Sequence, residues 1–394
     1  MKKCMNKNLC LLGLGLSLSI GNGCSSSTAA DAMSNYADIV SASYADSLSS
    51  AKDLDTAIDT FVAGPDAAGL TAAQDAWKAS REPYLQTEVY RFYNGPIDNE
   101  EDGPEGLINA WPLDENYIDY VLNADGSFDD TAGIVNDTSA EISAANLESL
   151  NEKDGDANIA TGYHAIEFLL WGQDTSATGP GDRAYTDYVT GEGGTHANQD
   201  RRGAYLGVAS EMLVGHLQIL VDAWDSSKSD NYRSEFLAAE PNEGLRRIMT
   251  GMILLAGFET GSERLQPALD NKSQEDEHSC FSDNTHRDMI QDVQGVMNVW
   301  KGTYTKLDGS KIEGTGIYDV INEQDADLAT KIDGQLTAAL DAANALVVPF
   351  DQEIAEGNTD GNARVQATIT ALFELETGLQ EAFTLLGLTI PPRE

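Results

Sequence analysis

The chain has 394 residues, a length that favours two domains over one. Its 65 Asp and Glu residues against 24 Lys and Arg residues give a formal net charge of -41. This charge argues against binding to nucleic acid, to polyanionic ligands or to anionic membrane surfaces, and leaves cations as candidate ligands. Hydrophobic residues make up 41% of the chain, enough for a sizeable core, so wholesale disorder is excluded.

The first residues, 1–23, are predicted to be a signal peptide. Lys2, Lys3 and Lys7 form a positive region ahead of an apolar run over Leu9–Ile20, which is too short to span a membrane as a helix. We expect no later segment to reach the roughly 20 apolar residues that a spanning helix needs. The protein is therefore expected to leave the cytoplasm for the cell envelope.

Small residues directly before Cys24 resemble the processing site of bacterial lipoproteins. On this interpretation Cys24 carries the lipid, residues 24–35 form a flexible tether, and the lipid is the attachment to the membrane. Gly21 stands where such sites usually have an aliphatic residue. Ordinary secretion into the periplasm is the alternative.

Helical periodicity dominates the rest of the chain, while alternating β-branched runs are few. We therefore expect an all-α protein whose antiparallel helices pack as bundles. Apolar residues recur at i, i+3, i+4 and i+7 over Ala51–Val62, Thr71–Glu82, Arg202–Trp224, Gly244–Phe258, Thr285–Trp300, Glu323–Leu346 and Asn362–Leu386.

A long connection rich in Gly, Thr and Asp over 174–200 is the best candidate for a domain boundary. It divides the mature chain into an N-terminal helical half, 36–175, and a C-terminal helical half, 176–394.

The segment Gly162–Asp174 carries the most informative pattern. On a helix, His164 and Glu167 lie three residues apart and project from one face. An imidazole and a carboxylate so placed can share a metal ion, as in the Glu-x-x-His pairs of di-iron bundles with the order reversed, although other helices must complete the site. The alternative is a core histidine hydrogen-bonded to Glu167, because the neighbouring residues are apolar.

Two further segments are rich in side chains that can bind metals. A non-helical loop over 90–115 carries several acids among aromatic residues. The segment 273–288 holds two histidines, Cys280 and five acids. For both segments, helix capping or solvation is the alternative. The chain has no His-Glu-x-x-His sequence, so that type of zinc-peptidase site is absent.

At these segments the chain resembles the imelysin-like family, and more narrowly its iron-regulated protein A branch. The resemblance covers nearly all of the chain after about residue 35. It rests on Gly162-x-His164-x-x-Glu167 with its Phe168–Gly172 continuation, on the loop from Asn94–Asp98 to Trp111–Asp114, and on Gln274–Asp283.

The resemblance implies an all-α fold of two bundle-like halves with the functional site in the cleft between them. It also implies an exported protein, often a lipoprotein, that is tied to iron uptake. His164 and Glu167 match the motif positions proposed to bind metal. Glu88 resembles an N-terminal acid that faces the same cleft.

The leading hypothesis from the sequence is a protein that binds iron, or an iron-loaded ligand, and works with other envelope components of iron uptake. His164, Glu167, Glu88 and nearby acids would form an oxygen-rich shell that suits iron better than zinc. The rival is an imelysin-type metallopeptidase, in which a bound metal activates water and a carboxylate acts as base. A third interpretation is structural, with the motif locking two bundles together.

Overall fold

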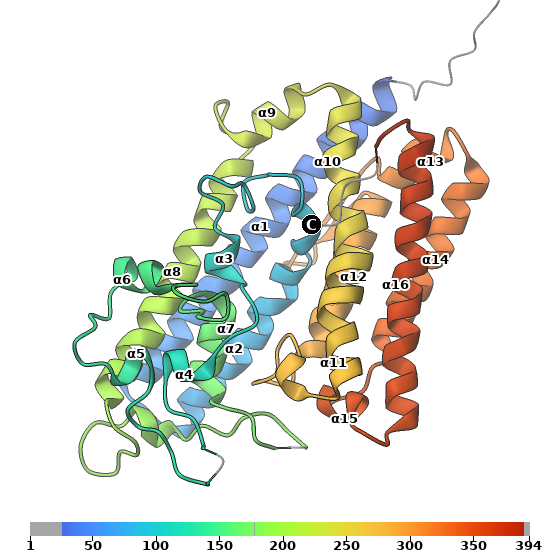
Figure 1. Ribbon diagram of the computed structural model, residues 1–394. Coiled ribbons are helices and arrows are strands. Elements are labelled where there is room, and N and C mark those ends of the chain that lie inside the picture. The colour runs from blue at the N-terminus through green and yellow to red at the C-terminus, as the bar shows by residue number, and fades with distance from the viewer. Residues whose placement is uncertain (1–25, 124, 177, 390–394) are drawn as a thin grey trace, which may run out of the picture.

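The computed structural model describes residues 26–123, 125–176 and 178–389, and its regular structure is almost entirely helical (Figure 1). Within these residues the strands form a single short hairpin of β1 (Thr303–Thr305) and β2 (Lys311–Glu313). The all-α prediction is therefore confirmed.

The predicted helical stretches each overlap one of the longer helices, and the largest difference is at the N-terminus, where 51–62 is only the last part of α1. The longer helices are α1 (Ser26–Ala63), α2 (Ala67–Leu85), α7 (Gly162–Trp171), α8 (Gln199–Trp224), α10 (Pro241–Ile253), the π-helix η3 (Leu254–Leu265), α12 (Thr285–Lys301), α14 (Ala326–Asn344) and α16 (Thr359–Leu385). Shorter elements connect them: η1 (Glu88–Tyr90), α3 (Glu105–Ile108), α4 (Glu115–Ile118), α5 (Gly133–Asn136), α6 (Ala144–Leu150), η2 (Tyr185–Tyr188), α9 (Tyr232–Ala238), α11 (Gln266–Asn271), η4 (Gln274–Asp276), α13 (Ile317–Asn322) and α15 (Phe350–Ile354).

The start of α1 corrects one prediction. Residues 26–35 are helical, so the flexible tether predicted over 24–35 is wrong from Ser26 onward. Ala29, Ala32 and Met33 recur at helical spacing and are 1%, 2% and 2% exposed, so this first part of the helix is held by burial. The signal peptide (1–23) and Cys24 lie outside the described residues.

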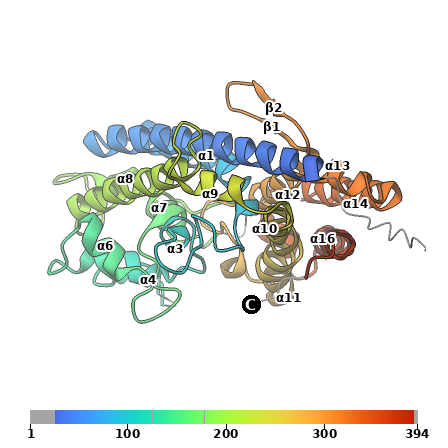
Figure 2. The ribbon, with the colours of Figure 1, turned by 90° about the horizontal axis from the view of Figure 1, so that it is seen from above.

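Helix α1 connects the two sides of the molecule. Its 38 residues span about 57 Å at the α-helical rise of about 1.5 Å per residue. It packs against α2 and α8 on one side and against α10, α13 and the hairpin on the other. Figure 2 shows it as the long helix that runs along one face of the fold.

The packing of α8 bears on the predicted division of the chain. This helix follows the boundary predicted between residues 175 and 176, yet it packs against α1 and α7, which precede that boundary. Buried apolar residues from Ala29 to Phe383 also form one connected cluster. A division at residue 175 would therefore cut through a packed group of helices. The two halves, 36–175 and 176–394, and a cleft between them stay predictions.

Helix α8 is, within the described residues, the one helix that is long and apolar enough to cross a membrane. No such segment was expected after the signal peptide, so α8 departs from that expectation. Its Leu206, Leu213 and Leu217 side chains are fully buried in the core. These leucines therefore belong to the core.

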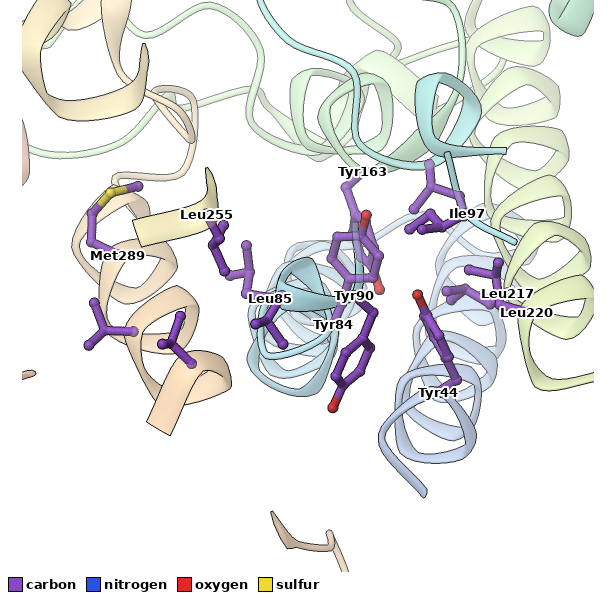
Figure 3. Packing of buried hydrophobic residues seen from close by; sticks show 14 of the residues in the cluster. Tyr44, Tyr84, Leu85, Tyr90, Ile97, Tyr163, Leu217, Leu220, Leu255 and Met289 are labelled. Carbon is purple, nitrogen blue, oxygen red and sulfur yellow. The ribbon is translucent and has the colours of Figure 1, made fainter. Parts of the chain in front are cut away.

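Aromatic contacts pack the motif helix α7 against α2, and Figure 3 shows two of the side chains involved, Tyr84 and Tyr163. The rings of Tyr84 and Tyr163 lie with their centroids 4.9 Å apart. Trp77 of α2 donates from Nε1 to the carbonyl oxygen of Tyr163 over 2.9 Å. Because such pairs stabilise packing beyond the area they bury, α7 is held in one orientation relative to α2.

Candidate functional site

The motif helix α7 begins at a glycine for a steric reason. Gly162 has a φ of +82°, and a Cβ added to it would lie 2.4 Å from the carbonyl oxygen of Ile108. Only glycine accepts both the left-handed backbone and this close approach. All ten residues of α7 are buried. Gly162 therefore lets α7 begin directly against the loop that carries Asn109 and Trp111.

The side chains of His164 and Glu167 meet, as their spacing predicts. His164 Nδ1 and Glu167 Oε2 share a hydrogen bond of 2.9 Å, and both side chains are fully buried. Glu167 Oε1 accepts two more hydrogen bonds, from the backbone N–H of Ser282 at 3.0 Å and from its hydroxyl at 2.6 Å. Both carboxylate oxygens are thus engaged, whereas His164 Nε2 has no hydrogen-bond partner.

Burial also determines the charge of this pair. Burial lowers the pKa of His164 well below its usual value, and the neighbouring His278 and Arg81 lower it further. Burial raises the pKa of Glu167 to about 8, although hydrogen bonds from Ser282 act in the opposite direction. Both shifts favour the neutral form, as expected for ionisable groups without solvent. The geometry therefore matches the alternative of a core histidine bonded to Glu167, with one nitrogen left over.

A second imidazole–carboxylate pair lies against the first. The rings of His164 and His278 are 4.9 Å apart in an edge-to-face arrangement. His278 Nδ1 bonds to Asp288 Oδ2 at 2.8 Å, and Arg81 lies 3.4 Å from the same oxygen. Burial together with the charge of Arg264 lowers the pKa of His278 to about 4. This pair belongs to the segment 273–288, where the sequence indicated a cluster of ligand-type side chains without singling it out.

Glu88 makes its ion pairs with arginines and not with the motif pair. Its Oε2 is 2.5 Å from Arg264 and 2.8 Å from Arg91, and Arg264 also binds Asp292 at 2.8 Å. Burial acts to raise the pKa of Glu88, but the two guanidinium groups outweigh it and lower the pKa to about 2. Glu88 is thus an ionised carboxylate that two arginines neutralise.

Two glycines determine where the backbone of Glu88 runs. A Cβ on Gly251 of α10 would lie 2.1 Å from the carbonyl oxygen of Val89, and one on Gly295 of α12 would lie 2.6 Å from that of Gln86. The segment from Gln86 to Val89 therefore packs directly against the backbones of two helices. This contact joins sequence positions that local patterns do not connect.

The three predicted ligands His164, Glu167 and Glu88 do not form one metal shell. Among the described residues, no three His, Cys, Asp or Glu side chains converge where a metal ion could bind. The oxygens of Glu167 are occupied by hydrogen bonds, and Glu88 is held by arginines. Two atoms of these three residues have no hydrogen-bond partner, His164 Nε2 and Glu88 Oε1. The donor set does not fit a bare metal ion.

A pocket of about 370 Å³ opens beside these groups. Two of its lining side chains, Trp111 and His278, also pack against the His164 ring, at 5.0 and 4.9 Å between centroids. His164 itself is fully buried and lies behind them. The lining consists of Arg91, Glu105, Asn109, Ala110, Trp111, Pro112, Glu152, Glu259, Glu263, Arg264, Pro267, Glu275, Asp276 and His278.

The sequence and fold of this chain match known proteins over most of its length. A family model described as Imelysin matches residues 40–379. Iron-regulated protein A of Synechococcus elongatus (strain ATCC 33912 / PCC 7942 / FACHB-805) is 24% identical over 350 residues, which cover 87% of this chain and 82% of the relative.

Two crystal structures share the fold. An iron-regulated protein A precursor from Parabacteroides distasonis ATCC 8503 has a TM-score of 0.71 at 19% identity, covering 93% of this chain and 97% of the other. An imelysin-like protein from Psychrobacter arcticum 273-4 has a TM-score of 0.64 at 13% identity, and the match covers 93% of this chain and 98% of the other. At these identities the likeness shows a shared fold.

Proposed function

Because this chain belongs to the imelysin family, we propose that it is an exported envelope protein that binds iron, or an iron-loaded ligand, in bacterial iron uptake. The name of its relative, iron-regulated protein A, supports the link to iron. The observation that carries the proposal is a pocket directly beside the buried motif pair, with His278 and Trp111 between the pocket and His164.

The geometry favours an iron-loaded ligand over a bare ion. No three ligand-type side chains of the described residues converge on one point, whereas the pocket has the volume of a small-molecule site. In this proposal His164 and Glu167 are positioning residues that hold the rings of His278 and Trp111 at the pocket wall. Delivery of the cargo would involve other envelope components of iron uptake, and Cys24 would carry the lipid that anchors the protein on the periplasmic side of a membrane.

The alternative activity is that of an imelysin-type metallopeptidase. Such an enzyme needs a carboxylate that can take a proton from water. Glu167 accepts hydrogen bonds at both oxygens and Glu88 is paired with arginines. These contacts make the two predicted ligands poor candidates for that base.

The test is a titration of the purified protein with ferrous iron and with two iron chelates, ferric citrate and ferrioxamine B. We expect at least one of these probes to bind near 1:1. His164→Ala should weaken that binding at least about tenfold, because it leaves a cavity behind Trp111 and His278. Helix content by circular dichroism should stay unchanged. His216→Ala, on α8, is the matched control and should bind as the wild type does.

Unchanged affinity in His164→Ala would contradict the assignment of the site. Failure of all three iron probes would contradict iron binding itself. Metal-dependent cleavage of an unfolded protein such as casein, lost in His164→Ala, would instead establish the peptidase.

A further inference from the structure

The pocket beside His164 is lined mainly by acids. Six of its lining residues are Glu or Asp and two are Arg. Arg91 pairs with Glu105 at 3.2 Å, and Arg264 pairs with Glu259 at 2.9 Å. Glu88 forms an additional ion pair with each of these two arginines. Within the described residues, four lining acids make no ion pair: Glu152, Glu263, Glu275 and Asp276.

This excess of unpaired carboxylates decides the sign of the charge that the pocket attracts. Charges of one sign around a concave site focus their field into it and raise the local concentration of ligands of opposite sign. An anionic iron chelate would be repelled. Trp111 adds a half-buried indole face to the wall, a surface that attracts cations.

Two unpartnered donors of the pocket lining suit a ligand that carries acceptor atoms. Asn109 lines the pocket and is 4% exposed; its Oδ1 accepts a hydrogen bond from Arg81 at 2.5 Å, but its Nδ2 has no partner. Arg264, 5% exposed, likewise has an unpartnered Nε. Buried donors without acceptors are costly. A ligand that carries oxygen acceptors can satisfy such donors, and a bare cation cannot.

We infer that the pocket binds a small organic cation, with an ammonium group among the carboxylates of Glu152, Glu263, Glu275 and Asp276 and with acceptor oxygens toward Asn109. This inference rests on the proposed function and narrows it, because the iron-loaded ligand is then a positively charged chelate. The negative wall disfavours an anionic chelate, and the lack of a metal shell among the described residues disfavours an unchelated ion.

The test compares two chelates that share one ferric core and carry tails of opposite charge. Ferrioxamine B carries a free ammonium tail, and its N-succinylated form has the same ferric hydroxamate core with a carboxylate instead. Isothermal titration at low salt should show the cationic chelate binding at least about tenfold more tightly, and the preference should shrink as salt is added.

Charge-removing variants locate the effect. Glu152→Gln combined with Glu263→Gln should reduce the preference for the cationic chelate over the anionic one to below about threefold, because two carboxylates of the pocket that make no ion pair are lost. The matched control removes two exposed carboxylates elsewhere, with Glu211→Gln and Glu374→Gln, and should leave the preference unchanged. Equal binding of both chelates, tighter binding of the anion, no binding of either, or a double variant that behaves like its control would each overturn the inference.

Metal-free ferrioxamine B separates the two proposals. If the metal-free form binds as tightly as the ferric form, the pocket recognises the organic cation and the role in iron uptake fails. If both ferric chelates bind equally well, iron binding stands and the charge assignment fails.

Discussion

Asp283 illustrates at the scale of one residue how burial changes the chemistry of a side chain. It lies near Asp174, Glu277 and Asp351, and these carboxylates interact electrostatically. Burial, and then the charges of Asp174 and Asp351, raise the pKa of Asp283 to about 7. Among the described residues, Asp283 makes no ion pair, and its Oδ2 has no partner. The sequence places Glu277 and Asp283 in one segment, but it does not show that Asp174 and Asp351 come close to them.

This pKa predicts how stability depends on pH. An unfolded Asp has a pKa of about 3.9, so between about pH 4 and pH 7 the folded protein holds a proton that the unfolded chain has lost. The contribution of Asp283 to the free energy of unfolding should therefore fall as pH rises through this range. Asp283→Asn removes the carboxylate and suits the left-handed backbone at this position, where φ is 55°.

We expect Asp283→Asn to be more stable than the wild type at pH 8, by on the order of 1 kcal/mol after allowance for solvent screening. The two proteins should differ little at pH 4. Urea unfolding at both pH values measures this. Asp53→Asn, at an exposed position of α1, is the control, and an equal gain in that variant would show that net charge rather than the site is responsible.

At the scale of elements, the motif helix α7 depends on its first residue as much as on His164 and Glu167. Gly162 has a positive φ and no room for a Cβ beside Ile108. At Gly207, in the interior of α8, no atom lies within 4 Å of such a Cβ. A Cβ is therefore excluded at position 162 and accepted at position 207.

Gly162→Ala should lower the free energy of unfolding by more than about 2 kcal/mol, because both the backbone conformation and the contact with Ile108 are lost. Gly207→Ala should raise it by up to about 1 kcal/mol, because alanine is the better helix former. Thermal unfolding followed by circular dichroism measures both. Equal stability of the two variants would refute the steric role of Gly162.

At the scale of the whole molecule, α1 and one continuous core join the elements that supply the site. Glu88 and the motif pair precede residue 175 in the chain, while Arg264, His278 and Asp288 follow it. The pocket lining likewise draws on 91–152 and on 259–278. Attachment to the envelope is a separate property, because the predicted lipid site precedes the described residues.

Cys24→Ser tests that attachment. We expect the full-length wild type to fractionate with membranes and to incorporate labelled palmitate, and the variant to do neither, because one cysteine would carry all of the anchoring lipid. Cys280→Ser, which changes a buried thiol, should leave fractionation unchanged. Membrane attachment that persists in Cys24→Ser would rule out the lipoprotein assignment.

The sequence by itself determined the helical class, the approximate helix positions and the side-by-side placement of His164 and Glu167, because helical periodicity and a spacing of three residues are local properties. Only the tertiary structure decided that Ser282 donates hydrogen bonds to Glu167 and that arginines form ion pairs with Glu88. It also decided that His278 and Trp111 lie between His164 and the pocket. These contacts join residues far apart in the chain. Partners over such separations follow from packing, which no local pattern encodes.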